Sequence, residues 1–530
     1  MAHPPRRTTA TAGAGAEAGG DGYGGPLRPV PVGGRAVDRP PAPEHHRTMT
    51  SVQPPTPTSR PAAPAGAPPA AAPAAPAEHL GHGLRTRHLT MMGLGSAIGA
   101  GLFLGSGVGI ATAGPAVLVS YAIAGVLVVL IMRMLAEMAS AMPATGSFSV
   151  YAEAALGRWA GFTLGWVYWF TLIMVLGAEI TGVAQIVTGW LPGVPQWGVA
   201  LVVVALFAVV NLAGVRRFGE LEFWFALVKV VAIVGFLVLG TLLVLGLLPG
   251  TDPVGTTNLL GHGGFAPAGV GGVAAGLLVV VFAFGGIEIV TIAAAEARDP
   301  QRAVGRATRT IVWRILLFYV GSVALMVLVL PWDAPALQES PFVAVLDVAG
   351  LPGTARLMEV VVVVALLSAF NANVYATSRM AYSLARRGDG PAVLHRVSRR
   401  DVPWVAVLVS VAFGLVAVVL NRVLPDTLLG ILLNAVGAAL LVVWVLVAVA
   451  QLRLRPRLVA EARARGEELP LRMWGYPWLT WATLVALAGL VVLMLADGAA
   501  RGQLLATAGL VAVVVGIYGV TALVRRRRAA

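Results

Sequence analysis

Long apolar runs alternate with short polar stretches from Arg87 to near the C-terminus. Each run holds roughly 20 residues, the length that a helix needs to span about 30 Å of hydrocarbon. Helices buried in soluble proteins rarely run so far without a charge. The pattern therefore predicts an all-α polytopic membrane protein with twelve transmembrane helices. These helices are expected at 88–111, 115–139, 159–187, 196–213, 222–247, 270–295, 310–330, 356–384, 403–421, 427–451, 478–496 and 503–524.

Arginines gather in alternate connections between these segments, for example Arg386 and Arg387 after the eighth. The opposite connections hold few basic residues, with only Arg356, Arg422 and Arg501 near them. Cytoplasmic loops of membrane proteins carry such an excess of basic residues. The pattern therefore predicts a multi-pass protein of the cytoplasmic (cell) membrane with both termini on the cytoplasmic side.

Residues 1–84 differ in composition and are rich in Ala, Pro and Gly. Such a segment cannot bury enough apolar surface to offset the entropy lost on ordering. It also lacks the compact apolar region of a signal peptide. We expect 1–84 to be a disordered cytoplasmic tail and 85–525 to be the transmembrane domain.

The composition of the whole chain supports a membrane protein. It is 57% hydrophobic and 12% charged, with a mean hydropathy of +0.81, whereas soluble domains carry about 25% charged residues. The formal net charge of +13 does not indicate a nucleic-acid partner, because Lys229 is the only lysine and the arginines lie between apolar runs. That distribution is typical of membrane topology.

Enzyme chemistry finds little support in the sequence. The chain has no cysteine, which excludes disulfides, thiolate metal sites and a cysteine nucleophile. It also lacks an H-E-x-x-H zinc pair and a G-x-S-x-G nucleophile elbow. We therefore expect a non-enzymatic protein with no metal and no cofactor, whose partners are a small molecule and the lipid bilayer. The oligomeric state stays open.

Two of the twelve segments contain glycine clusters, Gly99 and Gly101 in the first and Gly285 and Gly286 in the sixth. Glycine costs a helix about 1 kcal/mol relative to alanine, so both segments unwind easily. Unwound backbone inside a membrane is tolerated only beside a cavity. The two segments lie five apart, which matches a five-helix inverted repeat whose broken helices meet at the bilayer midplane. Close helix packing through small residues is the alternative.

A broken helix can bind a zwitterion. Its new N-terminus offers N–H groups and a positive dipole to a carboxylate, and the freed carbonyls accept from an ammonium. We expect amides near Gly99, Ala100 and Gly101 to bind a carboxylate, and the stretch from Phe282 to Gly285 to bind the amine. The predicted substrate-binding residues are Ser96, Ala97, Ile98, Gly99, Ala100, Gly101, Phe282, Ala283, Phe284, Gly285 and Glu288.

Charged residues inside apolar segments are costly and mark functional positions. Glu179 lies in the middle of the third segment, Lys229 early in the fifth, and Glu288 beside the second glycine cluster. A buried structural hydrogen bond is the alternative for both glutamates. Lys229 could instead reach the cytoplasmic face near Glu220, two turns away.

Other polar residues have a structural alternative. Glu137 and Glu296 lie near cytoplasmic ends of segments, where helix capping or pairing with arginine is expected. Ser368, Asn371 and Asn373 lie on one side of the eighth segment, as site residues or as contacts between helices.

Several stretches resemble the amino acid permeases of the amino acid–polyamine–organocation superfamily. They include Arg87-His-Leu-Thr, Gly95-Ser-Ala-Ile-Gly-Ala-Gly-Leu-Phe, Gly157-Arg-Trp-Ala-Gly-Phe-Thr and Arg386-Arg-Gly-Asp-Gly-Pro-Ala-Val. The resemblance covers about residues 85–525. It implies the leucine-transporter-like fold, with ten core helices in two inverted five-helix repeats and two peripheral helices.

Within this family, three stretches look most like bacterial 4-aminobutyrate (GABA) permeases. They are Met132-Arg-Met-Leu-Ala-Glu-Met, Glu288-Ile-Val-Thr-Ile-Ala-Ala-Ala-Glu and Leu471-Arg-Met-Trp-Gly-Tyr-Pro-Trp. The stretch Phe282-Ala-Phe-Gly-Gly-Ile-Glu departs from the GABA-permease pattern. The resemblance implies import of GABA or a related small amino acid by proton symport with alternating access. Proline, aromatic or other neutral amino acids remain open, as do exchange or export and a non-transporting amino acid sensor.

The resemblance also implies how transport is driven. Several relatives use sodium, held at a second cation site between segments one and eight. In proton-coupled members a lysine occupies that site, within a stretch similar to Glu222-Phe-Trp-Phe-Ala-Leu-Val-Lys229. Lys229 is therefore the expected proton-coupling residue and Glu179 the second candidate. Ser368 and Asn371 are possible polar residues of this second site.

Overall fold

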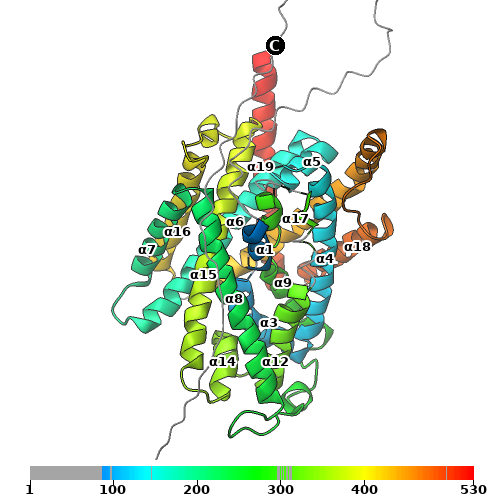
Figure 1. The fold of residues 1–530 in the computed structure, drawn as a ribbon. Helices are drawn as coiled ribbons and strands as arrows, with labels where there is room; N and C mark the ends of the chain where they lie inside the picture. Colours follow the sequence, from blue (N-terminus) through cyan, green and yellow to red (C-terminus); the bar gives the residue numbers. More distant parts are fainter. Residues whose placement is uncertain are drawn as a thin grey trace, which may run out of the picture. The chain divides into compact units, whose positions relative to one another are not determined.

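The computed structural model describes residues 86–529 apart from 96–97, 145, 295–298, 300, 303, 306–307, 309–312, 426 and 497. The tail predicted at 1–84 lies outside the described residues, as do Ser96, Ala97 and Glu296. The described residues form helices joined by turns, with no strand among them (Figure 1).

Most of the helices lie in the predicted apolar segments. In chain order they are α1 (Thr86–Gly95), α2 (Ala100–Phe103), α3 (Gly105–Ala113), α4 (Val117–Ala141), α5 (Phe148–Leu156), α6 (Arg158–Trp190), α7 (Gln196–Leu212), α8 (Val215–Val244), α9 (Gly269–Ala283), α10 (Ile289–Ala294), the π-helical stretch Ile315–Gly321, α12 (Ser322–Val329), α13 (Pro335–Glu339), α14 (Pro341–Val348), α15 (Thr354–Arg386), α16 (Trp404–Val423), α17 (Leu428–Ala464), α18 (Trp478–Ala496) and α19 (Gly498–Ala529).

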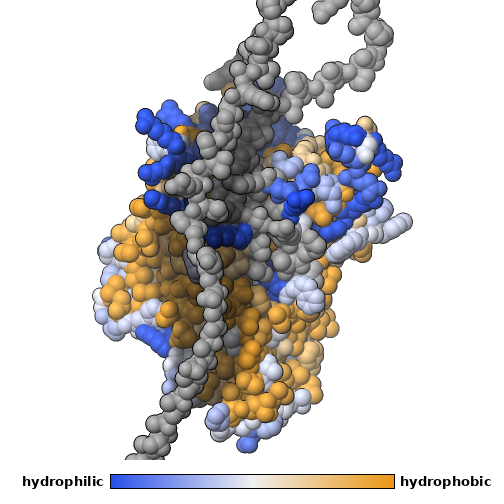
Figure 2. All heavy atoms as spheres, viewed as in Figure 1, coloured by the Kyte–Doolittle hydropathy of each residue, from blue (hydrophilic) through white to orange (hydrophobic). Residues whose placement is uncertain are grey.

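Eight helical stretches among the described residues are long and apolar enough to cross a membrane. Three shorter apolar helices, Gln196–Leu212, Gly269–Ala283 and Ile315–Val329, lie in other predicted segments. Figure 2 shows apolar side chains across the middle of the visible face and hydrophilic ones gathered towards its upper end. The all-helical membrane fold is confirmed, while the count of twelve spans stays a prediction.

Some boundaries differ from the predicted ones. The first two segments are joined by one 3₁₀ turn, Gly114–Ala116, in which Gly114 has φ +63°. Helix α17 continues to Ala464, well past the predicted end of its segment. Three short helices were not predicted, because each has nine residues or fewer and does not stand out as a long apolar run: α5 (Phe148–Leu156), α13 (Pro335–Glu339) and α14 (Pro341–Val348).

Helix α15 is the most buried of the long apolar helices among the described residues. It packs along α6 and α8 (Figure 1), and most of its apolar length is buried inside the protein. By contrast, α18 and α19 are mostly exposed along their apolar lengths. The core that positions the site is therefore formed by α15 and its neighbours, with α18 and α19 at its periphery.

Candidate functional site

Both glycine-rich segments are interrupted where the sequence predicts a break. The first leaves the helix after Gly95, and α2 begins at Ala100. The second leaves α9 after Ala283 and resumes at Ile289 in α10. Gly286, inside the second break, has φ +91°, a conformation that glycine adopts without strain.

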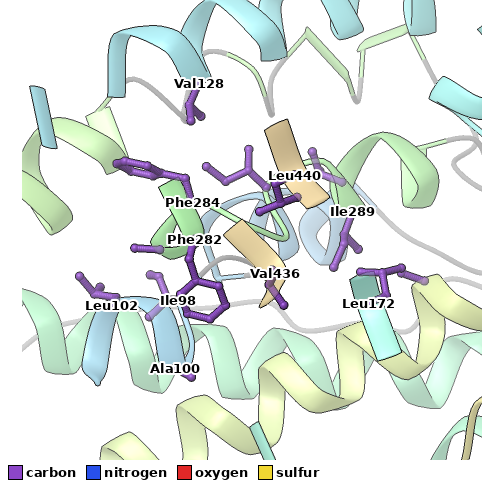
Figure 3. Close-up of a cluster of buried hydrophobic side chains, with 14 of the residues drawn as sticks. Ile98, Ala100, Leu102, Val128, Leu172, Phe282, Phe284, Ile289, Val436 and Leu440 are labelled. Atoms are coloured by element: carbon purple, nitrogen blue, oxygen red, sulfur yellow. The ribbon is translucent and has the colours of Figure 1, made fainter. Parts of the chain in front are cut away.

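The two interrupted helices touch at their breaks. A Cβ atom on Gly101 would lie 2.6 Å from the Cα of Ala283, so the two backbones are in direct contact. Figure 3 shows residues of both breaks, among them Ile98 and Phe282, in one apolar cluster with Val436 of α17. Segments one and six therefore meet, as predicted. At Gly101 the two backbones are closely packed, with no room for a side chain between them.

The amide at the start of α2 has a partner within the protein. The Ala100 N–H donates to both carboxylate oxygens of Glu179, with N···O distances of 3.2 Å to Oε1 and 3.3 Å to Oε2. Glu179 comes from the middle of α6 and is buried. In this conformation a carboxylate of the protein thus occupies the amide that was predicted to bind a substrate carboxylate.

Lys229 reaches the other side of the first break. Its ammonium donates to the carbonyl oxygens of Gly95, at 2.7 Å, and Ile98, at 3.0 Å. The side chain is fully buried, and Glu220 is paired with Arg87 instead. Lys229 is therefore directed towards the break, which contradicts the alternative that it reaches the surface near Glu220.

Ser368 and Asn371 of α15 contact a carboxylate that sequence reasoning overlooked. The Ser368 hydroxyl donates to Glu222 Oε1 at 2.8 Å, and the Asn371 amide donates to Oε2 at 3.4 Å. The Asn211 amide of α7 donates in turn to Asn371 Oδ1 at 3.0 Å. All of these side chains are buried. Asn373 takes no part and donates to the carbonyl of Ala369.

Glu222 could have been found from its spacing. It precedes Lys229 by seven residues on α8, and residues seven apart lie on the same face of a helix. A carboxylate two turns from a buried lysine is therefore a natural counter-charge, and both side chains are fully buried. In the sequence, Glu222 is noticed only as part of the stretch that ends at Lys229.

The second break is lined by aromatic side chains. Phe284 packs on Tyr319 and Tyr121, with ring centroids 4.7 Å and 6.0 Å away. Glu288 is buried there and lines a cavity of about 10 Å³ together with Trp444 of α17. That volume suffices for about one water molecule, so the side chains close around Glu288 in this conformation.

Two further charged side chains are buried among the described residues, Arg314 and Glu137. Sequence reasoning overlooked Arg314, although it is the only charged residue of the predicted segment 310–330. Glu137 on α4 pairs with Arg455 at 3.0 Å and accepts from the Gln451 amide at 2.8 Å. The prediction that Glu137 pairs with an arginine is confirmed.

An all-helical membrane protein whose two interrupted helices touch, with buried charges beside both breaks, has the architecture of a secondary transporter. The chain belongs to the amino acid permease family, which it matches over residues 88–530. The family resemblance seen in the sequence is thereby confirmed.

Relatives of known name differ in their stated amino acid. The aromatic amino acid transport protein AroP of Corynebacterium glutamicum is 56% identical over 435 residues, which cover 81% of this chain and 93% of that protein. The gamma-aminobutyric acid permease of Bacillus subtilis is 44% identical over 445 residues, covering 84% of this chain and 93% of that protein. Amino acid transport is common to both names.

Solved structures support the fold. The crystal structure of a mutant manganese transporter of Eremococcus coleocola superposes with a TM-score of 0.53 and 16% sequence identity, covering 84% of this chain and 94% of that one. At this identity the similarity concerns the fold alone.

Proposed function

We propose that this amino acid permease is a secondary active importer that couples an amino acid to a proton by alternating access. The observation that carries the coupling proposal is the pair of hydrogen bonds from Lys229 to Gly95 O and Ile98 O. Freed carbonyls at a helix break are the groups that coordinate a coupling cation in many transporters. Here an ammonium of the protein fills that position.

A titrating lysine would change the strength of this link. In its charged form the ammonium donates charge-assisted bonds to both carbonyls, which are roughly twice as strong as neutral ones. Loss of the proton weakens the hold on the first break and allows α1 and α2 to move relative to α8. Proton release would thereby be tied to the conformational change.

Aromatic amino acids are our first candidate substrates. The relative that is 56% identical carries that name, and Phe284, Tyr319 and Tyr121 surround the second break. Aromatic rings pack favourably on one another. GABA is the second candidate, favoured by the relatives named as GABA permeases and by three stretches of the sequence.

We further propose twelve spans in two inverted five-helix repeats plus two peripheral helices, with both termini cytoplasmic. The positions of the long and short apolar helices support this arrangement. The arginine distribution along the chain supports the orientation.

Purified protein in proteoliposomes tests the proposal directly. We expect labelled phenylalanine or tyrosine to accumulate when the outside is acidic, without sodium, and to stop accumulating when a proton ionophore is added. Competition with unlabelled amino acids, including GABA, ranks the substrates. Accumulation that requires sodium would refute proton coupling, and binding without flux would indicate a sensor.

A further inference from the structure

A groove runs between α6 and the peripheral helix α19. It encloses about 400 Å³, a volume within the range of roughly 300–1,000 Å³ typical of small-molecule pockets. Its long walls are apolar and come from two helices. The wall residues are Phe162, Trp166 and Phe170 of α6 and Val514, Ile517 and Thr521 of α19.

The groove is held open by specific contacts at its margin. Val514 is buried against Phe162, and the ring of Tyr518 lies 5.5 Å from that of Phe162. The Trp166 indole N–H donates to the carbonyl of Asp389 at 3.0 Å, in the connection that follows α15. These contacts fix the two helices and the connection around the groove.

One end of the groove is charged. Arg525 lines it and lies 3.6 Å from Asp389 Oδ1, whereas Arg158 donates to the same oxygen at 2.8 Å. Two guanidinium groups thus face one carboxylate, which leaves one positive charge in excess. Arg526 and Arg527 follow, both exposed, and add to it.

Asp389 supplies a second polar feature. The residue lines the groove and its side chain is buried, and among the described residues its Oδ2 atom has no hydrogen-bond partner. A carboxylate oxygen can only accept, so a ligand that satisfies it must bring a donor. A hydroxyl group next to an anionic group meets both requirements of this end.

We propose that the groove between α6 and α19 binds an anionic phospholipid with a hydroxylated headgroup, such as phosphatidylglycerol. Its acyl chain lies along the apolar walls, its phosphate faces Arg525, and a headgroup hydroxyl donates to Asp389. The arginine-rich end is the one predicted to be cytoplasmic, where anionic headgroups attract basic residues. A second copy of the chain fits less well, because two-fold pairing at this end would bring like-charged arginines together.

Native mass spectrometry in a neutral detergent tests this, with phosphatidylglycerol and phosphatidylcholine of the same chain length as probes. We expect wild-type protein to retain phosphatidylglycerol in preference to phosphatidylcholine. Thr521→Trp fills the groove and should abolish that binding. Arg525→Gln should weaken it about fivefold, since one basic residue near anionic lipid contributes about 1 kcal/mol.

The matched controls are Val520→Trp, at an exposed position next to Thr521, and Arg526→Gln, the next arginine. Both should bind phosphatidylglycerol as the wild type does. The proposal would be overturned if the wild type bound both lipids equally. It would also be overturned if the groove variants bound phosphatidylglycerol as well as the control variants do. If Thr521→Trp converts a dimer to a monomer and leaves lipid binding unchanged, the groove binds a second copy of the chain instead. If Thr521→Trp does not fold, the proposal is tested by comparing phosphatidylglycerol binding in Arg525→Gln and Arg526→Gln.

Discussion

The amide of Ala100 donates to both carboxylate oxygens of Glu179, at 3.2 Å and 3.3 Å, where the first broken helix resumes. A carboxylate at a helix N-terminus is stabilised by the free N–H groups and the helix dipole. If a substrate carboxylate uses the same amide, it must displace Glu179. The side chain thus acts as an internal competitor for the position.

Glu179→Gln is expected to bind substrate more tightly than the wild type. The carboxamide can still accept from Ala100, but a neutral acceptor is held less strongly than a charged one by about 1 kcal/mol, which corresponds to about fivefold in affinity. Equilibrium binding of labelled substrate to purified protein measures the change. Glu359→Gln, which removes a carboxylate of α15 outside the site, should leave affinity unchanged; unchanged affinity in Glu179→Gln as well would refute the competition.

Gly101→Ala is expected to abolish transport. Its Cβ would lie 2.6 Å from Ala283 Cα, and the backbone of α9 cannot yield as a flexible side chain would. Overpacking of this kind costs about 1–3 kcal/mol and displaces one break from the other. Gly105→Ala is the matched control, because its Cβ would meet nothing closer than 3.7 Å. Equal uptake by the two variants, measured in whole cells at equal expression, would contradict the structural role of Gly101.

Lys229→Gln is expected to lose proton-driven accumulation while it keeps exchange of labelled for unlabelled substrate. The amide can still donate to the carbonyls of Gly95 and Ile98, but it cannot gain or lose a proton in the physiological range. Parallel measurements of accumulation and counterflow in proteoliposomes separate the two activities. Glu220→Gln, which removes the charge of the carboxylate that contacts Arg87 and His88 of α1, should retain both. Accumulation by Lys229→Gln with an unchanged pH dependence would exclude Lys229 from coupling.

Glu222→Leu is expected to lower the thermal stability of the purified protein. It leaves Ser368 and Asn371 without their acceptor, at a cost of about 1–3 kcal/mol, and leaves the buried charge of Lys229 less compensated. Adding Lys229→Met to Glu222→Leu should destabilise less than the sum of the two single changes, because both buried charges are then gone. Additive losses in melting temperature across the four proteins would show that the two charges are independent.

The sequence predicted the architecture of the site better than its contacts. Glycine clusters marked both breaks because backbone freedom is a local property, and Lys229 stood out as a lone charge in an apolar run. The bond between Ala100 and Glu179 joins residues 79 positions apart, and no local pattern encodes it. Glu222 escaped notice for a different reason: its spacing from Lys229 pointed to it, but a carboxylate near a helix end is common and attracts little attention by itself.

Substrate preference was also beyond the sequence pattern. The stretches that resemble GABA permeases lie largely outside the breaks, so they indicate the subfamily of the protein more than the shape of its substrate pocket. The side chains that surround Phe284 come from α4 and the π-helical stretch Ile315–Gly321. Their convergence depends on how these helices pack.

The contact between Gly101 and Ala283 restricts how this protein can evolve. A backbone that already touches its neighbour leaves no room for a side chain, so Gly101 cannot vary without displacing one break from the other. New substrate preferences must therefore arise from side chains on the surrounding helices, such as Tyr121 and Trp444. Libraries that aim to change selectivity should randomise those positions and hold the glycines constant.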